Sequence, residues 1–306
     1  LCIIILIYIN NIMKYSENAF VMIHFGNKPK YLELEIYLSI ALRNNSKNDI
    51  VYMYSIVDTP QSYVDIMKNY CTHVIPYNDN NITDFKDFPS IYAHFNTLRT
   101  CNFLFAYQLI QYKKICLIES DTIILNNIDD IFKLKTPSAL VYIDKENQNN
   151  YLKNDKINLD VNKILSTCAN KSYMNGGALL IKPSIAKYKL YIKTIKIIIE
   201  KKCCNPNETL FLIVNKTIYN LPLKYNGVQF DIDRIGHACK IDMKKYLSIV
   251  HVSTNEYKHV EFIRDGYLEK YKFKKATLCY FINIFKKLYY DKYNKEIINI
   301  IKTLKI

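Results

Sequence analysis

Short apolar runs alternate with longer amphipathic segments through the first part of this 306-residue chain. The runs have the length of strands, and the segments between them carry apolar residues at helical spacing. Such alternation predicts an α/β fold with one Rossmann-like, mostly parallel central sheet and helices on both faces. We expect strands at 19–23, 50–57, 73–76 and 115–118, and helices at 32–42, 61–71 and 91–112. A hydrophobic content of 50% is enough for a sizeable core, and no Pro/Ser/Gly-rich linker divides the chain.

The run at 115–118 ends on two carboxylates, Glu119 and Asp121, with Ser120 between them. Open α/β sheets bind their ligands at the carboxyl ends of such strands. Two acids at that edge can hold Mg²⁺ or Mn²⁺, which prefer oxygen ligands and complete their shells with water and substrate phosphate. A solvated pair of acids is the alternative, and the pair alone does not decide between the two.

Two of the six glycines, Gly176 and Gly177, are adjacent and follow Asn175. Glycine permits positive φ and close approach of the backbone to a ligand, so we expect a ligand-facing turn before a strand at 178–181. A plain tight turn is the alternative. The Asn- and Lys-rich stretch 146–160 is expected to be the least structured loop.

The formal charge of +14 favours anionic partners such as nucleotide sugars, acidic membranes or nucleic acid. No helix-turn-helix spacing, zinc finger or arginine-rich block is visible in the sequence, so nucleic acid is not expected. Nine cysteines without a C-x-x-C pair fit reduced thiols in a cytoplasmic protein better than a disulfide framework or a structural zinc site.

The two ends differ from the middle of the chain. Residues 1–9 are an apolar run, and we treat residues 1–12, which precede Met13, as a doubtful N-terminal extension. A truncated signal-anchor, which would place the protein at a Golgi or secretory membrane, is the alternative. Residues 13–272 are expected to form the main domain. Residues 273–306 form a basic helical segment that caps this domain or, alternatively, contacts a membrane or a partner.

Several ordered motifs between residues 20 and 259 resemble glycosyltransferase family 8, the glycogenin- and galactinol-synthase-like retaining transferases with a GT-A fold. The segment 112–132, with its Glu-Ser-Asp, resembles the family's strand, D-x-D motif and following helix. Tyr173-Met-Asn-Gly-Gly-Ala-Leu-Leu-Ile-Lys-Pro-Ser184 resembles its F-N-S/G-G strand. The segments 206–212 and 221–226 resemble its D-Q/D-E helix start and its L-P-x-x-Y-N, and His251 stands where its H-x-x-G-x-x-K-P begins.

The resemblance implies a metal-dependent retaining glycosyltransferase that moves a hexose from a nucleotide sugar, expected to be UDP-linked, to an unknown acceptor. Its divalent cation, Mn²⁺ ahead of Mg²⁺, would be bound by Glu119, Asp121 and His251. Three residues are implied as catalytic: Asn175, which would face the donor sugar, and Asn207 and Glu208, which would line the reacting face. The residues implied for donor binding are Ile23, Tyr31, Arg99, Ser120, Gly176, Gly177 and Lys258.

Four departures from the family pattern keep a second interpretation open. Glu119 stands for the first Asp of D-x-D, and Asn207 replaces the usual Asp. The motif after His251 lacks its Gly and retains Lys258 only with one inserted residue, while Arg99 lies about a helical turn early. The alternative is a catalytically weak or inactive relative that acts as a binding module. The sugar, the acceptor and a homodimer all stay open, as does membrane contact through either terminus.

Overall fold

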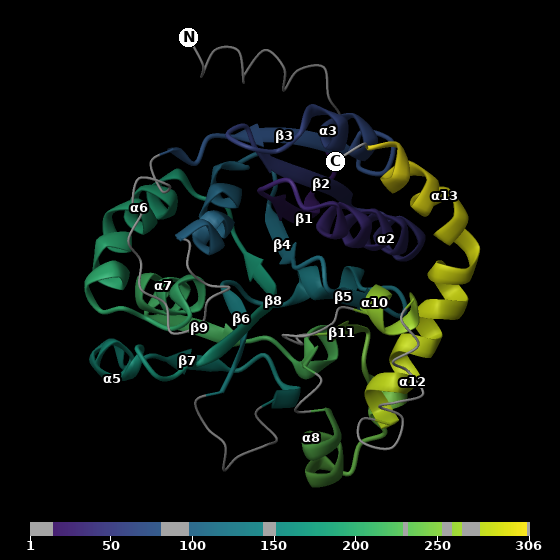
Figure 1. The fold of residues 1–306 in the computed structure, drawn as a ribbon. Coiled ribbons are helices and arrows are strands. Elements are labelled where there is room, and N and C mark those ends of the chain that lie inside the picture. The colour runs from purple at the N-terminus through teal and green to yellow at the C-terminus, as the bar shows by residue number, and fades with distance from the viewer. Residues whose placement is uncertain are drawn as a thin grey trace.

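The computed structural model describes residues 15–80, 98–142, 151–228, 232–252, 259–264 and 276–304. Its centre is an eight-stranded sheet with the strand order β3-β2-β1-β4-β8-β6-β9-β7 (Figure 1). These strands are β1 (Asn18–His24), β2 (Asp49–Ser55), β3 (His73–Tyr77), β4 (Lys114–Ile118), β6 (Ser138–Val141), β7 (Lys156–Asn158), β8 (Met174–Ile181) and β9 (Thr217–Asn220).

The first half of the sheet is entirely parallel and the second half is mixed. Strands β3, β2, β1 and β4 pair in parallel, whereas β8 runs antiparallel to both β4 and β6. A separate three-stranded sheet holds β10 (Gly227–Val228), β11 (Ile249–His251) and β5 (Thr122–Ile124). The predicted α/β fold with a mostly parallel central sheet is confirmed, and the small second sheet is an addition that the sequence did not reveal.

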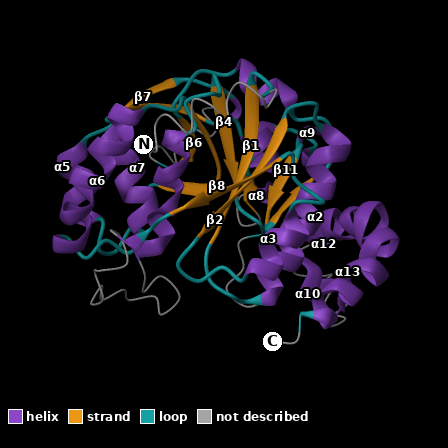
Figure 2. Cartoon of the chain, turned by 90° about the horizontal axis from the view of Figure 1, so that it is seen from above, coloured by secondary structure: helices purple, strands orange, loops and turns teal. Residues whose placement is uncertain are grey.

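Helices cover both faces of the large sheet (Figure 2). On one face lie α2 (Pro29–Asn45), α3 (Gln61–Met67), α12 (Ala276–Phe285) and α13 (Asp291–Thr303); on the other lie α5 (Val161–Thr167), α6 (Ile185–Glu200) and α7 (Pro206–Asn215). Strand β1 supplies both cores in alternation: Phe20 and Met22 point to the first and Ala19 and Val21 to the second, all at most 1% exposed. A strand buried on both faces reads as a continuous apolar run, as β1 does.

The segment before β4 differs from its prediction as an α-helix over 91–112. Residues 91–97 lie outside the described part of the chain, and Leu98–Gln108 forms a 3₁₀ helix. Side chains three residues apart share one face of a 3₁₀ helix. Arg99 and Asn102 accordingly both donate to the Asp79 carboxylate, at 2.8 and 3.2 Å, and these bonds suit the tighter winding.

Part of the stretch expected to be a loop is a strand. Residues 143–150 lie outside the described residues, but β7 within 146–160 pairs antiparallel with β9. The Asn154 amide secures this edge by donating to the Ser138 hydroxyl at 3.1 Å and to the Asn220 carbonyl at 2.8 Å. Loop-like composition was overridden here by tertiary pairing.

The C-terminal helices pack against the domain beside α2 (Figure 1). A π-helical turn, Lys286–Tyr290, joins α12 to α13. Phe285 meets the Tyr37 ring of α2 edge-on at 5.3 Å between centroids, and the Tyr289 hydroxyl donates to the Ile124 carbonyl of β5 at 3.2 Å. Within the described residues, none of the helices combines the length and the apolar character that a membrane span requires.

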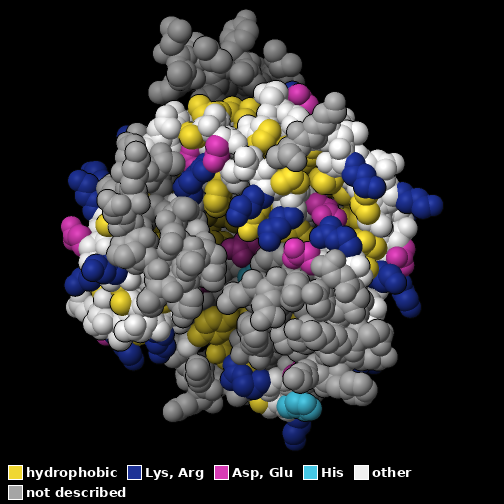
Figure 3. Space-filling model, in the orientation of Figure 1, with side chains coloured by type: hydrophobic (Ala, Val, Ile, Leu, Met, Phe, Trp, Pro, Cys, Tyr) yellow, Lys and Arg dark blue, Asp and Glu magenta, His cyan; other side chains and the backbone are white. Residues whose placement is uncertain are grey.

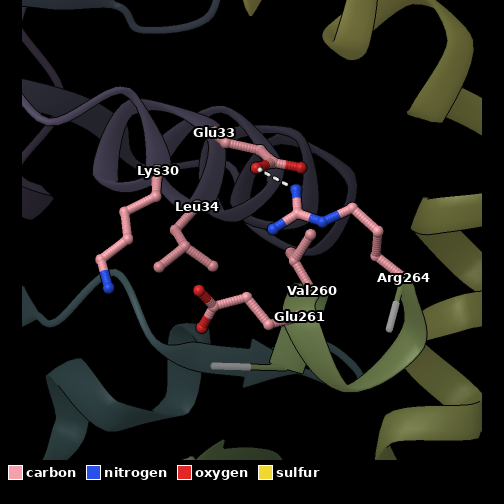
Figure 4. Close-up of a pocket in the computed structure, with 6 residues that line it drawn as sticks. All are labelled: Lys30, Glu33, Leu34, Val260, Glu261 and Arg264. Carbon is pink, nitrogen blue, oxygen red and sulfur yellow. Dashed lines mark hydrogen bonds and ion pairs between the residues drawn. The ribbon is translucent and has the colours of Figure 1, made fainter. Parts of the chain in front are cut away.

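Helix α10 (His259–Arg264) lies against the first turns of α2 and leaves a small pocket between the two (Figure 4). Arg264 reaches across to Glu33, to which its Nη1 donates at 3.2 Å, and Val260 is buried below. Burial raises the pKa of Glu33 even though Arg264 opposes the rise.

The eight cysteines in the described part of the chain are free thiols, as predicted.

Candidate metal and donor site

One turn and one strand pairing bring the predicted metal ligands together. Glu119 and Asp121 lie in the turn between β4 and β5, and the Thr122 amide donates back to the Glu119 carbonyl at 3.2 Å. Strand β11 runs antiparallel to β5 with His251 opposite Thr122, and the Val252 amide donates to the Asp121 carbonyl at 3.0 Å. The small sheet therefore places the imidazole beside the two acids.

The three side chains meet at a single point. His251 Nε2 lies 3.1 Å from Glu119 Oε2 and 3.2 Å from Asp121 Oδ1, and one ligand atom from each residue falls within 4.8 Å of the others. The Glu119 side chain is 46% exposed, whereas those of Asp121 and His251 are 10% and 4% exposed. The group is buried on two sides and open on the side of Glu119. Figure 3 shows acidic and histidine side chains recessed near the middle of one face, with basic side chains beside them.

Hydrogen bonds behind the imidazole determine which nitrogen faces the acids. Asn175 Oδ1 lies 3.0 Å from the Gly177 amide nitrogen, 2.9 Å from Asn226 Nδ2 and 2.8 Å from His251 Nδ1. A backbone N–H can only donate, so the Asn175 atom is the oxygen, and an amide oxygen can only accept. His251 Nδ1 must therefore carry a hydrogen, and Nε2 is the atom directed at Glu119 and Asp121.

This arrangement fits a divalent cation. Burial lowers the pKa of His251, but Asp121 and Glu119 outweigh it and raise the pKa to about 10. Between the imidazole and the acids there is accordingly a proton or a metal ion, since a bare lone pair at Nε2 would repel both carboxylates. Two oxygen ligands and one imidazole nitrogen, with further positions open to solvent, are a donor set that suits Mn²⁺ and admits Mg²⁺.

Gly177 is required by the close approach of His251. A Cβ at this position would lie 2.3 Å from His251 Nδ1 and 2.6 Å from its Cγ, distances that real Cβ atoms essentially never show. The predicted turn at 175–177 is wrong, because these residues belong to β8, whose register with β6 shifts at this point. A bulged strand lets the glycine backbone pass under the ring. The sequence predicted that the backbone of the two glycines comes close to a ligand. In the structure, the Gly177 backbone instead comes close to the His251 side chain.

Glu208 lies in the first turn of α7 on the other side of the acids. Its carboxylate accepts from the Gly176 amide at 3.2 Å, from Asn205 Nδ2 at 3.1 Å and from the Ser172 hydroxyl. Burial raises the pKa of Glu208 to about 7, aided by the nearby charge of Glu119 and opposed by these hydrogen bonds. Its neighbour Asn207 faces the same strand, and its buried Oδ1 has no hydrogen-bond partner among the residues described.

Of the other residues implied for donor binding, Ile23, Tyr31, Arg99 and Ser120 lie at the same edge of the sheet. Strand β1 pairs Val21 with Leu117 of β4, so Ile23 lies level with Glu119, and Tyr31 follows in the first turn of α2. The Arg99 guanidinium is engaged by Asp79 at 2.8 Å, by Asp58 and by the Ser55 hydroxyl at 3.1 Å. Ser120 separates the two acids. Lys258 lies outside the described residues.

The sequence did not assign roles to three residues that shape the site. Asn226 donates to Asn175, while Ser172 and Asn205 donate to Glu208. Asn226 stands at the end of the L-P-L-K-Y-N stretch, and the resemblance of this stretch to a family motif indicated that Asn226 could have a role. Ser172 stands in a polar stretch without any pattern, and only the fold reveals its contact with Glu208, 36 residues away. Asn205 precedes Glu208 by three residues, a spacing typical of a helix N-terminus.

No protein-family model matches the chain. An uncharacterised protein of Acanthamoeba polyphaga mimivirus is 33% identical to it over 127 residues, which cover 40% of this chain and 43% of that protein. Among solved structures, the galactosyltransferase LgtC in complex with donor and acceptor sugar analogues is 10% identical, covering 79% of this chain and 88% of its own with a TM-score of 0.54. The bifunctional glycosyltransferase WbbM is 12% identical, with a TM-score of 0.51 over 87% of this chain and 52% of its own. The chain thus has the GT-A fold of these glycosyltransferases.

Proposed function

We propose that this chain is a divalent-metal-dependent glycosyltransferase that moves a hexose from a nucleotide sugar, UDP-linked, to an acceptor. The observation that carries the proposal is the convergence of Glu119, Asp121 and His251 at the carboxyl end of the central strand of a GT-A fold. The fold is that of LgtC, whose structure was solved with donor and acceptor sugar analogues. Membership of family 8 and retention of the donor's anomeric configuration belong to the same proposal.

A bound cation would neutralise the charge that develops on a departing nucleotide diphosphate. Glu119 and Asp121 supply anionic oxygens, and neutral His251 supplies a nitrogen through Nε2. The anionic donor is also attracted by the net charge of +14, to which the exposed Lys28 and Lys30 contribute at the same edge of the sheet. Mn²⁺ is the cation we propose, with Mg²⁺ as the substitute.

The reacting face is assigned to Glu208, Asn207 and the backbone of β8. With a pKa raised to about 7, Glu208 is able to exchange a proton near neutral pH and to stabilise positive charge when ionised. The buried Asn207 Oδ1, which has no hydrogen-bond partner among the described residues, would accept from a sugar hydroxyl. Ile23 and Tyr31 would flank the nucleoside, and Lys258 would contribute a cation to the phosphates.

A catalytically weak or inactive binding module is the second candidate. It is favoured by Glu208, whose carboxylate is already held by Ser172, Gly176 and Asn205. It is also favoured by Asn207, which carries no charge where a carboxylate would stabilise a cationic centre. Such a module would bind a glycan or a partner without turnover.

Calorimetry with UDP in the presence and absence of Mn²⁺ tests the proposal. We expect Mn²⁺-dependent UDP binding that falls at least ~10-fold in Asp121→Asn, because one anionic oxygen is lost from the cation. Asp65→Asn is the matched control, since Asp65 lies exposed on α3 and, in the described part of the chain, pairs with Gln61 and Lys68. Hydrolysis of UDP-glucose, UDP-galactose and UDP-N-acetylglucosamine then separates enzyme from module. Absence of metal-linked UDP binding in the wild-type protein refutes the glycosyltransferase.

A further inference from the structure

Asn226 lies directly behind the candidate metal site and has no role in the function proposed so far. It is fully buried in the turn between the 3₁₀ helix Leu223–Tyr225 and β10. Strand β10 pairs with β11, with Val228 beside His251, so the turn that carries Asn226 is fixed relative to the imidazole. The backbone N–H of Asn226 also donates to the Leu223 carbonyl at 3.1 Å.

We propose that Asn226 is a positioning residue that, through Asn175, fixes the tautomer and direction of His251 for metal binding. The inference rests on the proposed metal site but assigns two residues to new tasks. Asn226 Nδ2 donates to Asn175 Oδ1 at 2.9 Å, and the same oxygen accepts from His251 Nδ1 at 2.8 Å. Ligand histidines generally bond their second nitrogen to an acceptor of this kind, and that bond orients the ring.

The orientation of the Asn226 side chain supports this role. Its Oδ1 is buried and has no hydrogen-bond partner among the described residues, an arrangement that is unfavourable for the folded state. Rotating the amide by half a turn would aim that oxygen at Asn175 Oδ1, so two acceptors would face each other. The structure keeps the less costly arrangement, in which Asn226 acts on Asn175 as a donor.

Asn175 acts as the relay between Asn226 and the ring. Its oxygen receives three hydrogens, one of them from the Gly177 amide at 3.0 Å, which cannot be reversed. With the oxygen held in place, His251 can satisfy it only as a donor from Nδ1, and Nε2 is left for the cation. The oxygen of Asn175 is then fully used by these three hydrogen bonds, so a sugar hydroxyl would be bound through its amide nitrogen.

Two substitutions distinguish positioning from simple space filling. Asn226→Leu keeps most of the volume but removes the donor, whereas Asn226→Ala removes both. If Asn226 positions His251, both variants bind Mn²⁺ at least ~10-fold more weakly, a loss typical of groups that orient metal ligands. If Asn226 only fills space, the Leu variant binds like the wild type. The control is Asn45→Ala, which removes an amide that donates to Ala41 and Tyr289 in the packing of α2.

Mn²⁺ affinity is measured by electron paramagnetic resonance, and unfolding by urea verifies that each variant is folded. The second readout needs no metal: the His251 Nδ1–H proton, seen by ¹H–¹⁵N NMR, is expected to exchange slowly in the wild type and at least ~10-fold faster in both variants. A wild type that binds no Mn²⁺ but shows the protected proton removes the proposed function alone. Unchanged Mn²⁺ affinity and unchanged proton exchange in Asn226→Leu overturn the inference.

Discussion

At the scale of single residues, Gly177 and Gly176 are neighbours with opposite tolerance for a side chain. A methyl group on Gly177 would lie 2.3 Å from His251 Nδ1 and 2.9 Å from Asn226 Oδ1, so Gly177→Ala must displace the imidazole. A methyl group on Gly176 would meet Glu119 Oε1 at 3.4 Å, an ordinary contact with a half-exposed carboxylate. We expect Gly177→Ala to weaken Mn²⁺ binding at least ~10-fold and to destabilise the fold by about 1–3 kcal/mol.

Gly176→Ala is the matched control and should retain both metal affinity and stability. Calorimetric Mn²⁺ titration and urea unfolding of the two variants provide the comparison. Equal losses in the two variants would mean that His251 does not lie against the Gly177 backbone.

How much of the site was predictable differs from residue to residue. Glu119 and Asp121 end an apolar run, and this local pattern placed them at the sheet edge without a structure. His251 became a candidate only through motif order, because its approach to the acids depends on the pairing of β5 with β11. Asn226 and Ser172 act through tertiary hydrogen bonds with residues far along the chain, and no local pattern encodes such bonds.

At the scale of elements, the C-terminal helices are attached to the domain by aromatic side chains. Phe285 is 2% exposed and contacts the rings of Tyr37, His259 and Tyr289. Removing such a ring leaves a cavity, and we expect Phe285→Ala to lower the free energy of unfolding by about 3–5 kcal/mol. Tyr280→Ala in the same helix removes a side chain that is 38% exposed. This substitution should change the free energy of unfolding by about 1 kcal/mol or less.

Urea unfolding monitored by far-UV circular dichroism measures both variants. If α12 and α13 belong to one cooperative unit with the sheet, Phe285→Ala shifts a single transition to lower urea. A separate early transition, with the main one unmoved, would show that the two helices unfold independently of the domain.

The strands were easier to predict than the segments that connect them. Apolar runs at 19–23 and 115–118 became β1 and β4 because burial on both faces leaves a strong local pattern. The 3₁₀ winding of Leu98–Gln108 depends on Asp79, and the formation of β7 depends on β9. Both partners are distant in sequence, so composition and periodicity carry no signal for them.

At the scale of the whole molecule, several buried groups bind protons more tightly in the folded state than in the unfolded chain. Burial lowers the pKa of His24, but Glu35 at 2.9 Å raises it above its ordinary value overall. The pKa of His251 rises to about 10 and that of Glu208 to about 7. Buried thiols such as Cys71, with a pKa raised to about 12, change in the same direction. These contributions therefore reinforce one another.

A group whose pKa is higher in the folded protein than in the unfolded chain stabilises the fold fully below its unfolded-state pKa. This stabilisation is lost as the pH rises through the group's folded-state pKa. Glu208 acts between its ordinary 4.5 and about 7, and His251 between 6.5 and about 10. We therefore expect the metal-free protein to lose unfolding free energy steadily from about pH 5 to about pH 9, each group contributing no more than about 1.4 kcal/mol per pH unit. Urea unfolding in chelator across this range measures the slope.

Two changes test the contribution of His251. His251→Gln should reduce the loss of stability in the upper part of this pH range. Mn²⁺ should restore stability near pH 9, because the cation replaces the proton at Nε2. A stability maximum near pH 8 without metal would mean that His251 does not hold its proton between the two acids.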